Sequence, residues 1–96
     1  MRYIGYPHDG SPMEAGADPH CYDSLAEARR GFAEHTRKSS WVSDDAYMDL
    51  YAFRDGRQFN EAWTEAEQYA DTGCPFDYMD YRLSIGPRGG VVSERG

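Results

Sequence analysis

Branched aliphatic side chains are scarce in this chain of 96 residues. Only eight residues are Val, Ile or Leu, whereas 14 are aromatic and eight of those are Tyr. The core must therefore be built mainly from aromatic rings, Met and Ala. Because a buried Tyr needs a partner for its hydroxyl, some of the rings are expected to lie half-exposed.

Long apolar runs are missing as well. No stretch of about 20 apolar residues is present, which excludes a membrane-spanning helix. Residues 1–6 lack the apolar segment of a signal peptide, so we expect a cytoplasmic protein without membrane contact. A chain this short buries only about two-thirds of its unfolded surface, so we predict a single domain over residues 1–96.

Closely spaced metal ligands are also absent. Zinc sites favour tight pairs such as C-x₂-C or H-x₃-H. The candidate ligands show no such spacing, and they are His8, Asp9, His20, Cys21 and Cys74. We predict no metal ion and no other cofactor. The two cysteines are expected to be free thiols in a reducing compartment, with a disulfide as the less favoured alternative.

The sequence also shows no residue spacing that is typical of a catalytic site. Cys21 with His20 or His35 could form a nucleophile and base, but no cation cluster near Cys21 would activate the thiol. Paired carboxylates are expected by chance in an acidic chain, and they are Asp44–Asp45 and Asp77 with Asp80. We expect a protein that is not an enzyme and has no catalytic residues, and a small enzyme of unknown class remains an alternative.

Basic residues are few, with nine Arg and one Lys against 17 acids, and the formal net charge is −7. Residues 41–81 carry ten acids and two bases, a local charge of −8. Direct nucleic-acid binding is therefore not expected, because phosphate contacts need clustered Lys and Arg. The acidic charge suits either solubility or attraction to a basic partner.

Two helices are predicted from their caps and their apolar faces. Residues 24–27, Ser-Leu-Ala-Glu, fit a capping box, and the following pattern predicts a helix that ends near residue 38. Gly31 inside this helix would allow close contact with another element. Asp55-Gly56 fits either a type I′ hairpin turn or a helix cap completed by Gln58. We favour the cap because one helical face gathers Phe59, Ala62, Trp63, Ala66 and Ala70.

Three segments are predicted to be strands because they alternate or are rich in bulky apolar side chains: 2–6, 46–53 and 81–85. Val91-Val92 could form a short fourth strand. Residues 7–20 are rich in Pro and Gly and predict a long loop. The predicted fold is α+β, in β-α-β-α-β order. A sheet of three to four strands would carry both helices on one face.

The strand 46–53 then presents two different faces. Its smaller side chains, Met48, Leu50 and Ala52, would pack beneath the helices. Tyr47, Tyr51 and Phe53 would lie on the uncovered face, together with Asp49. Exposed aromatic rings that gather in one place are typical of a contact surface. The same face would also allow a symmetric homodimer.

Arg88 lies in the turn-like segment Gly86-Pro87-Arg88-Gly89-Gly90. Its guanidinium and the neighbouring amides could hold a phosphate or a carboxylate. The simpler alternative is a hairpin turn whose glycines adopt positive φ, with Arg88 in solvent.

The ending Tyr-Arg-Leu-Ser-Ile-Gly-Pro-Arg-Gly-Gly-Val over residues 81–91, followed by Glu94-Arg95, resembles that of small uncharacterised accessory proteins of actinobacterial phages. The strong preference for Arg over Lys agrees with a GC-rich genome. The resemblance implies a phage accessory protein in a bacterial host, and many such proteins bind a host protein. It implies no functional residues.

The favoured hypothesis is therefore a non-enzymatic module that binds a host or phage protein through Tyr47, Tyr51, Phe53 and Arg88. An acidic DNA mimic that inhibits a nucleic-acid-binding protein is the alternative. Glu61, Glu65 and Gln68 would supply part of its polar row, and a solvated helix face is the simpler alternative.

Overall fold

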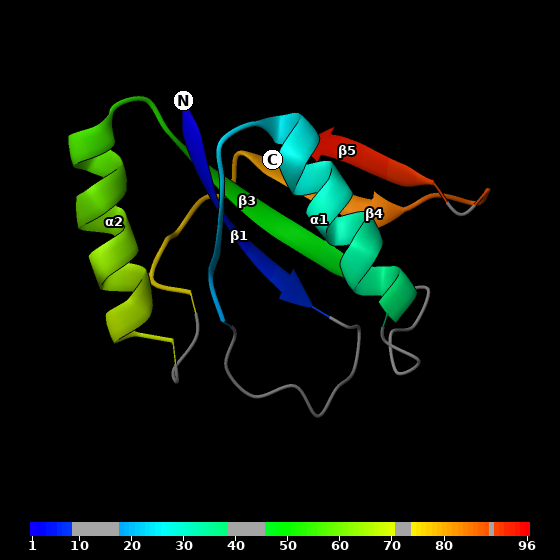
Figure 1. Cartoon of the computed structure of the whole chain (residues 1–96), viewed down its shortest axis with the longest axis horizontal. Helices are drawn as coiled ribbons and strands as arrows, with labels where there is room; N and C mark the ends of the chain where they lie inside the picture. The colour runs from blue at the N-terminus through cyan, green and yellow to red at the C-terminus, as the bar shows by residue number, and fades with distance from the viewer. Residues whose placement is uncertain (9–17, 39–45, 71–73, 89) are drawn as a thin grey trace.

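The chain folds into an antiparallel sheet with two helices, which confirms the α+β class. A computed structural model describes residues 1–8, 18–38, 46–70, 74–88 and 90–96. Its elements follow the order β1 (Arg2–His8), β2 (His20–Tyr22), α1 (Leu25–Lys38), β3 (Tyr47–Phe53), α2 (Gly56–Gln68), β4 (Tyr81–Ile85) and β5 (Val91–Arg95). The five strands lie side by side as β2-β1-β3-β4-β5 (Figure 1).

Two strands account for the difference from the predicted three or four. β5 is longer than the predicted Val91-Val92 and pairs with β4 as a hairpin. β2 pairs with β1, with Tyr22 opposite Tyr3. Three residues show no pattern of their own, so β2 could not be predicted from alternation. Pro7 and His8 extend β1 into the predicted loop, whose residues 9–17 lie outside the described part, as do Asp44–Asp45.

Both helices begin at the predicted caps. The backbone N–H of Glu27 donates to Ser24 Oγ at 3.1 Å, and the N–H of Asp23 donates to Glu27 Oε2 at 2.9 Å. At α2, the N–H of Gln58 donates to Asp55 Oδ1 at 2.8 Å. The helix-cap interpretation of Asp55-Gly56 is thus confirmed over the hairpin turn, because the side chain satisfies an amide that has no partner within the helix.

The prediction that both helices cover one face of the sheet is wrong. Met48 and Leu50 of β3 pack with Phe32 of α1 in one buried cluster. Ile4 and Tyr51, opposite one another on β1 and β3, belong to a second cluster with Phe59 of α2. Neighbouring residues of a strand point to opposite faces, so α1 and α2 cover opposite faces.

The physical reason for this arrangement is that β1 and β3 both bury side chains on both faces of the sheet. The alternating pattern of residues 46–53 combines aliphatic and Met side chains on one face with Tyr and Phe on the other. The aliphatic face is covered by α1, and α2 buries part of the aromatic face.

Gly31 makes the predicted close contact possible. The ring of Tyr22 lies between Gly31 of α1 and Gly5 of β1. A Cβ atom at Gly31 would lie 2.7 Å from Tyr22 Cε1, and one at Gly5 would lie 2.9 Å from Tyr22 Cε2. The two glycines therefore let α1 approach the β1–β2 edge of the sheet with an aromatic ring between them.

Candidate functional site

The predicted aromatic residues of β3 do not form one open surface. Tyr51 is only 8% exposed, and Phe53 is half-buried. Phe76, from the segment between α2 and β4, covers both, with ring centroids 5.0 Å from Tyr51 and 5.6 Å from Phe53. Tyr51 is therefore part of the core, and the expectation that it lies outward is wrong.

Tyr47 lies on the same face of β3 but is not part of the buried cluster that Tyr51 forms with Phe59 of α2. Its ring stacks on His8 at a centroid distance of 4.6 Å, and the Arg82 guanidinium lies 4.4 Å from its centroid. Arg82 also binds Asp49 through two hydrogen bonds, of 2.7 and 3.3 Å. The hydrogen bond to Asp49 raises the pKa of Arg82. The half-buried ring of Tyr47 thus already has two partners.

Arg88 is exposed in the turn between β4 and β5. The N–H of Gly86 donates to the carbonyl of Gly90 at 2.7 Å and closes the predicted hairpin, but Gly86 does not adopt the predicted positive φ. This turn and α2 lie at opposite ends of the molecule (Figure 1). Of the four predicted binding residues, the structure brings only Tyr51 and Phe53 together.

A groove of about 400 Å³ lies beside Phe53, between α2 and the segment that carries Phe76. Its lining residues are Phe53, Gln58, Glu61, Ala62, Glu65 and Phe76. The four residues of α2 have the spacing of one helical face. Ala62 is buried and the two Phe rings are half-buried, so they form the floor, whereas the three polar side chains are exposed and form the rim.

Charge is distributed unevenly around this groove. Glu61 and Glu65 place two carboxylates one helical turn apart on the rim. Arg57 Nε lies 3.5 Å from Glu61 Oε1, but both side chains are highly exposed, so this ion pair contributes little. The groove therefore combines an aromatic floor with a negatively charged rim.

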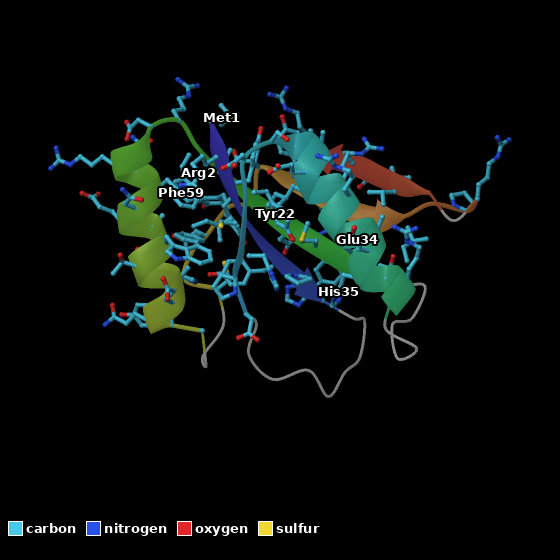
Figure 2. The ribbon with its side chains drawn as sticks, in the orientation of Figure 1. Met1, Arg2, Tyr22, Glu34, His35 and Phe59 are labelled. Atoms are coloured by element: carbon cyan, nitrogen blue, oxygen red, sulfur yellow. The ribbon has the colours of Figure 1, made fainter. Side chains whose placement is uncertain are left out.

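Phe53, Phe59 and Trp63 form an aromatic cluster at one end of α2, and the side chain of Arg2 packs against it. The guanidinium carbon of Arg2 lies 3.9 Å from the ring centroid of Phe59, at the junction of β1 and α2 (Figure 2). Phe59 lies 6.3 Å from Phe53 and 6.1 Å from Trp63, centroid to centroid. Arg2 also forms an ion pair of 3.1 Å with Asp23. The Phe59 ring thus accepts a guanidinium within the folded chain.

Two buried phenols, Tyr6 and Tyr51, contact Phe76, which lines the groove. The hydroxyl of Tyr6, a fully buried residue, has no hydrogen-bond partner of good geometry among the described residues. Burial raises the pKa of both Tyr6 and Tyr51, and the neighbouring Cys74 raises both further. Cys74 and Cys21 are free and exposed. Because a thiol is a weak hydrogen-bond acceptor, Cys74 replaces water poorly for the phenols.

A second pocket, of about 320 Å³, lies between α1 and the strands β1, β2 and β3. It brings His20 and His35 together with Glu34, and the last two lie near the C-terminal end of α1 (Figure 2). The remaining lining residues are Pro7, Tyr22, Gly31, Phe32 and Met48. The hydroxyl of Tyr22 donates to Met48 Sδ at 3.7 Å, and burial raises the pKa of this phenol.

The other predicted polar sets are the carboxylates Asp77 and Asp80 and the candidate metal ligands. Asp80, proposed as a partner of Asp77, accepts a hydrogen bond of 2.7 Å from the N–H of Ala52. Within the described ranges there is no group of three or more His, Cys, Asp or Glu side chains that could hold a metal ion. No helix in that part of the chain is long and apolar enough to cross a membrane.

Comparison with known proteins finds no matching family model, curated protein or solved structure. The resemblance to phage accessory proteins therefore stays a prediction. Glu61 and Glu65 were visible from their spacing, but Phe76 was not identified from the sequence. The one local signal was an aromatic residue directly after Pro75, in a segment predicted to be a loop.

Proposed function

We propose that this chain is a non-enzymatic protein-binding module whose groove beside α2 binds a basic segment of a partner protein. The observation that carries the proposal is the aromatic floor of Phe53 and Phe76 beneath the carboxylates of Glu61 and Glu65. Following the resemblance of its C-terminal segment, we propose a phage accessory protein that acts on a host or phage protein in the bacterial cytoplasm.

Charge complementarity supports a basic partner. The net charge of −7 attracts cations at long range, and the two rim carboxylates offer hydrogen-bond acceptors at short range. The aromatic floor offers apolar contact to the methylene groups of a Lys or Arg side chain. A basic peptide segment carries both features.

The groove favours this function over the acidic DNA mimic. A mimic needs a rigid row of carboxylates, whereas the rim of the groove carries two, Glu61 and Glu65. An apolar floor would also add nothing to an imitation of phosphates. The two hypotheses differ in their dependence on Phe76, which matters for a peptide-binding groove and not for a charged row.

The proposal is tested by a titration followed with ¹H–¹⁵N NMR spectra. The probe is a short Gly-Ser peptide with a basic residue at every third position. We expect shifts concentrated at the groove residues. Glu61→Gln with Glu65→Gln should abolish them, whereas Glu34→Gln with Glu67→Gln, which removes the same charge elsewhere, should leave them.

A Phe76→Leu variant separates the groove from general charge attraction. Binding should weaken because a ring is lost, while thermal unfolding confirms that the variant folds. If both double variants weaken binding equally, or if the shifts spread evenly over the acidic surface, the groove is not the binding site.

The small-enzyme alternative has its own observation, the pocket that holds His20, His35 and Glu34. Substitution of both His residues by Gln tests whether this pocket, rather than the groove, binds the peptide. We expect peptide binding at the groove to survive, because the pocket lies against α1 and the groove against α2. Loss of binding in this variant would contradict the proposal.

The proposal also includes self-association through the part of the sheet face around Tyr47. Val92, on this same face, is 40% exposed. Light scattering should report a dimer whose population depends on concentration and falls in Val92→Glu. A monomeric mass at every concentration would contradict this part of the proposal.

A further inference from the structure

We propose that the groove takes an arginine side chain of the partner, in preference to lysine. This inference rests on the proposed function, because it specifies which side chain of a basic segment occupies the groove. Three observations lead to it: the spacing of the carboxylates, the arrangement of the rings, and the guanidinium already bound by the same aromatic cluster.

The two rim carboxylates suit a planar fork of donors. Residues four apart on a helix have Cβ atoms roughly 5–6 Å apart, which places Glu61 and Glu65 on the same side of the groove. A guanidinium has five N–H donors in a fixed plane and can donate to both carboxylates together. A lysine ammonium is a compact charge that is more strongly hydrated, so it loses more on leaving water.

The floor of the groove suits a flat cation. Phe53 and Phe76 lie 5.6 Å apart with an angle of 59° between their planes, so they offer differently oriented surfaces. A guanidinium can stack on a ring face while its edge donates hydrogen bonds, and an ammonium cannot stack.

The chain itself provides an example of this contact. Arg2 stacks over Phe59 at 3.9 Å while its Nε donates to Asp23 at 3.1 Å. One guanidinium thus meets a ring face and a carboxylate at once. Phe53 lies between this internal pair and the groove, since it contacts Phe59 on one side and lines the groove with Phe76 on the other.

Arg57 would compete with the incoming arginine for Glu61. Its ion pair of 3.5 Å connects exposed side chains, so the partner can displace it at little cost. Removal of this competitor by Arg57→Gln should therefore strengthen binding modestly, by about twofold.

The test compares three versions of the same Gly-Ser peptide, with arginine, lysine or citrulline at every third position. Citrulline has nearly the shape of arginine but no charge. We expect the arginine peptide to bind at least about threefold more tightly than the lysine peptide, and the citrulline peptide to bind most weakly. Affinities come from calorimetry on the full chain.

Matched variants show which residues are responsible for the preference for arginine over lysine. Phe76→Leu should reduce the ratio of arginine to lysine affinity, because it keeps an apolar floor but removes a ring face. Glu67→Gln, which removes one charge outside the groove, should leave the ratio unchanged.

The outcomes distinguish the two proposals. An arginine-to-lysine ratio below about threefold, with both peptides mapped to the groove, overturns the arginine inference and leaves the proposed function standing. Failure of both basic peptides to bind at the groove overturns both. A preference for arginine that Phe76→Leu does not change overturns the stacking on which the inference is based.

Discussion

Removal of the buried hydroxyl of Tyr6 should stabilise the fold. Tyr6 has no exposed surface, and its hydroxyl has no well-placed partner in the described part of the chain. A buried polar group without a hydrogen bond costs roughly 1–3 kcal/mol relative to its hydrated state. Tyr6→Phe keeps the ring and its edge contact with Tyr51 at 5.9 Å while removing that cost.

The expected gain is about 1 kcal/mol in the free energy of unfolding, since the neighbouring thiol recovers part of the lost hydration. For a domain of this size, that gain corresponds to a rise in Tm of about 4–8 °C. Thermal unfolding followed by circular dichroism measures it. Tyr78→Phe is the matched control, because the Tyr78 side chain is 89% exposed and should change little.

The same variant should change the response to alkaline pH. Burial raises the pKa of Tyr6 in the folded chain, whereas an unfolded Tyr ionises near about 10. Above that pH the unfolded state loses its proton first, so the free energy of unfolding falls as pH rises. Tyr6→Phe should make this fall shallower, although Tyr51 still contributes.

Two results would refute this reasoning. A loss of 1 kcal/mol or more in Tyr6→Phe, roughly what a satisfied hydrogen bond contributes, would mean that the hydroxyl has a good partner. An unchanged slope of stability against pH above about 10 would mean that this phenol ionises as readily in the folded chain as in the unfolded one.

Three other substitutions test the packing and the caps. Gly31→Ala should lower Tm, because overpacking against Tyr22 costs about 1–3 kcal/mol. This cost outweighs the gain of about 1 kcal/mol in helix propensity. A higher Tm would contradict the close packing. Asp55→Ala should cost about 1 kcal/mol in urea unfolding and Asp55→Ser much less, whereas equal effects would exclude the cap. Arg82→Met leaves Asp49, whose side chain is 15% exposed, without its partner. The free energy of unfolding measured by chemical denaturation should fall by about 1–3 kcal/mol. No change would contradict a stabilising ion pair.

Local features of the fold were predictable from the sequence. The capping box at Ser24 and the N-cap at Asp55 determine where the helices begin, and their hydrogen bonds join residues three or four apart. Such contacts can be inferred without knowledge of the rest of the chain. The strands that alternate over several residues were also visible for this reason.

The placement of the helices could not be predicted because it depends on nonlocal packing. Residues 46–53 show two apolar faces, and either a solvent-exposed or a covered aromatic face is compatible with that pattern. The packing of α2 and Phe76 on the aromatic face decides between them. Tyr51 is buried because α2 and Phe76 both lie over this position.

The candidate site was predictable only in part. Phe53 came from the strand pattern, and Glu61 with Glu65 came from helical spacing. Phe76 joins them because the chain turns back across α2 before β4, and its contact with Phe53 connects residues that are 23 positions apart in the sequence. No local pattern determines such a contact.

The most direct test of the groove is an intermolecular NOE measurement with the arginine peptide bound to the full chain. We expect cross-peaks from the arginine side-chain methylenes to the ring protons of both Phe53 and Phe76. Cross-peaks confined to the pocket at His35, or to the hairpin turn at Arg88, would contradict the assignment of the α2 groove as the binding site.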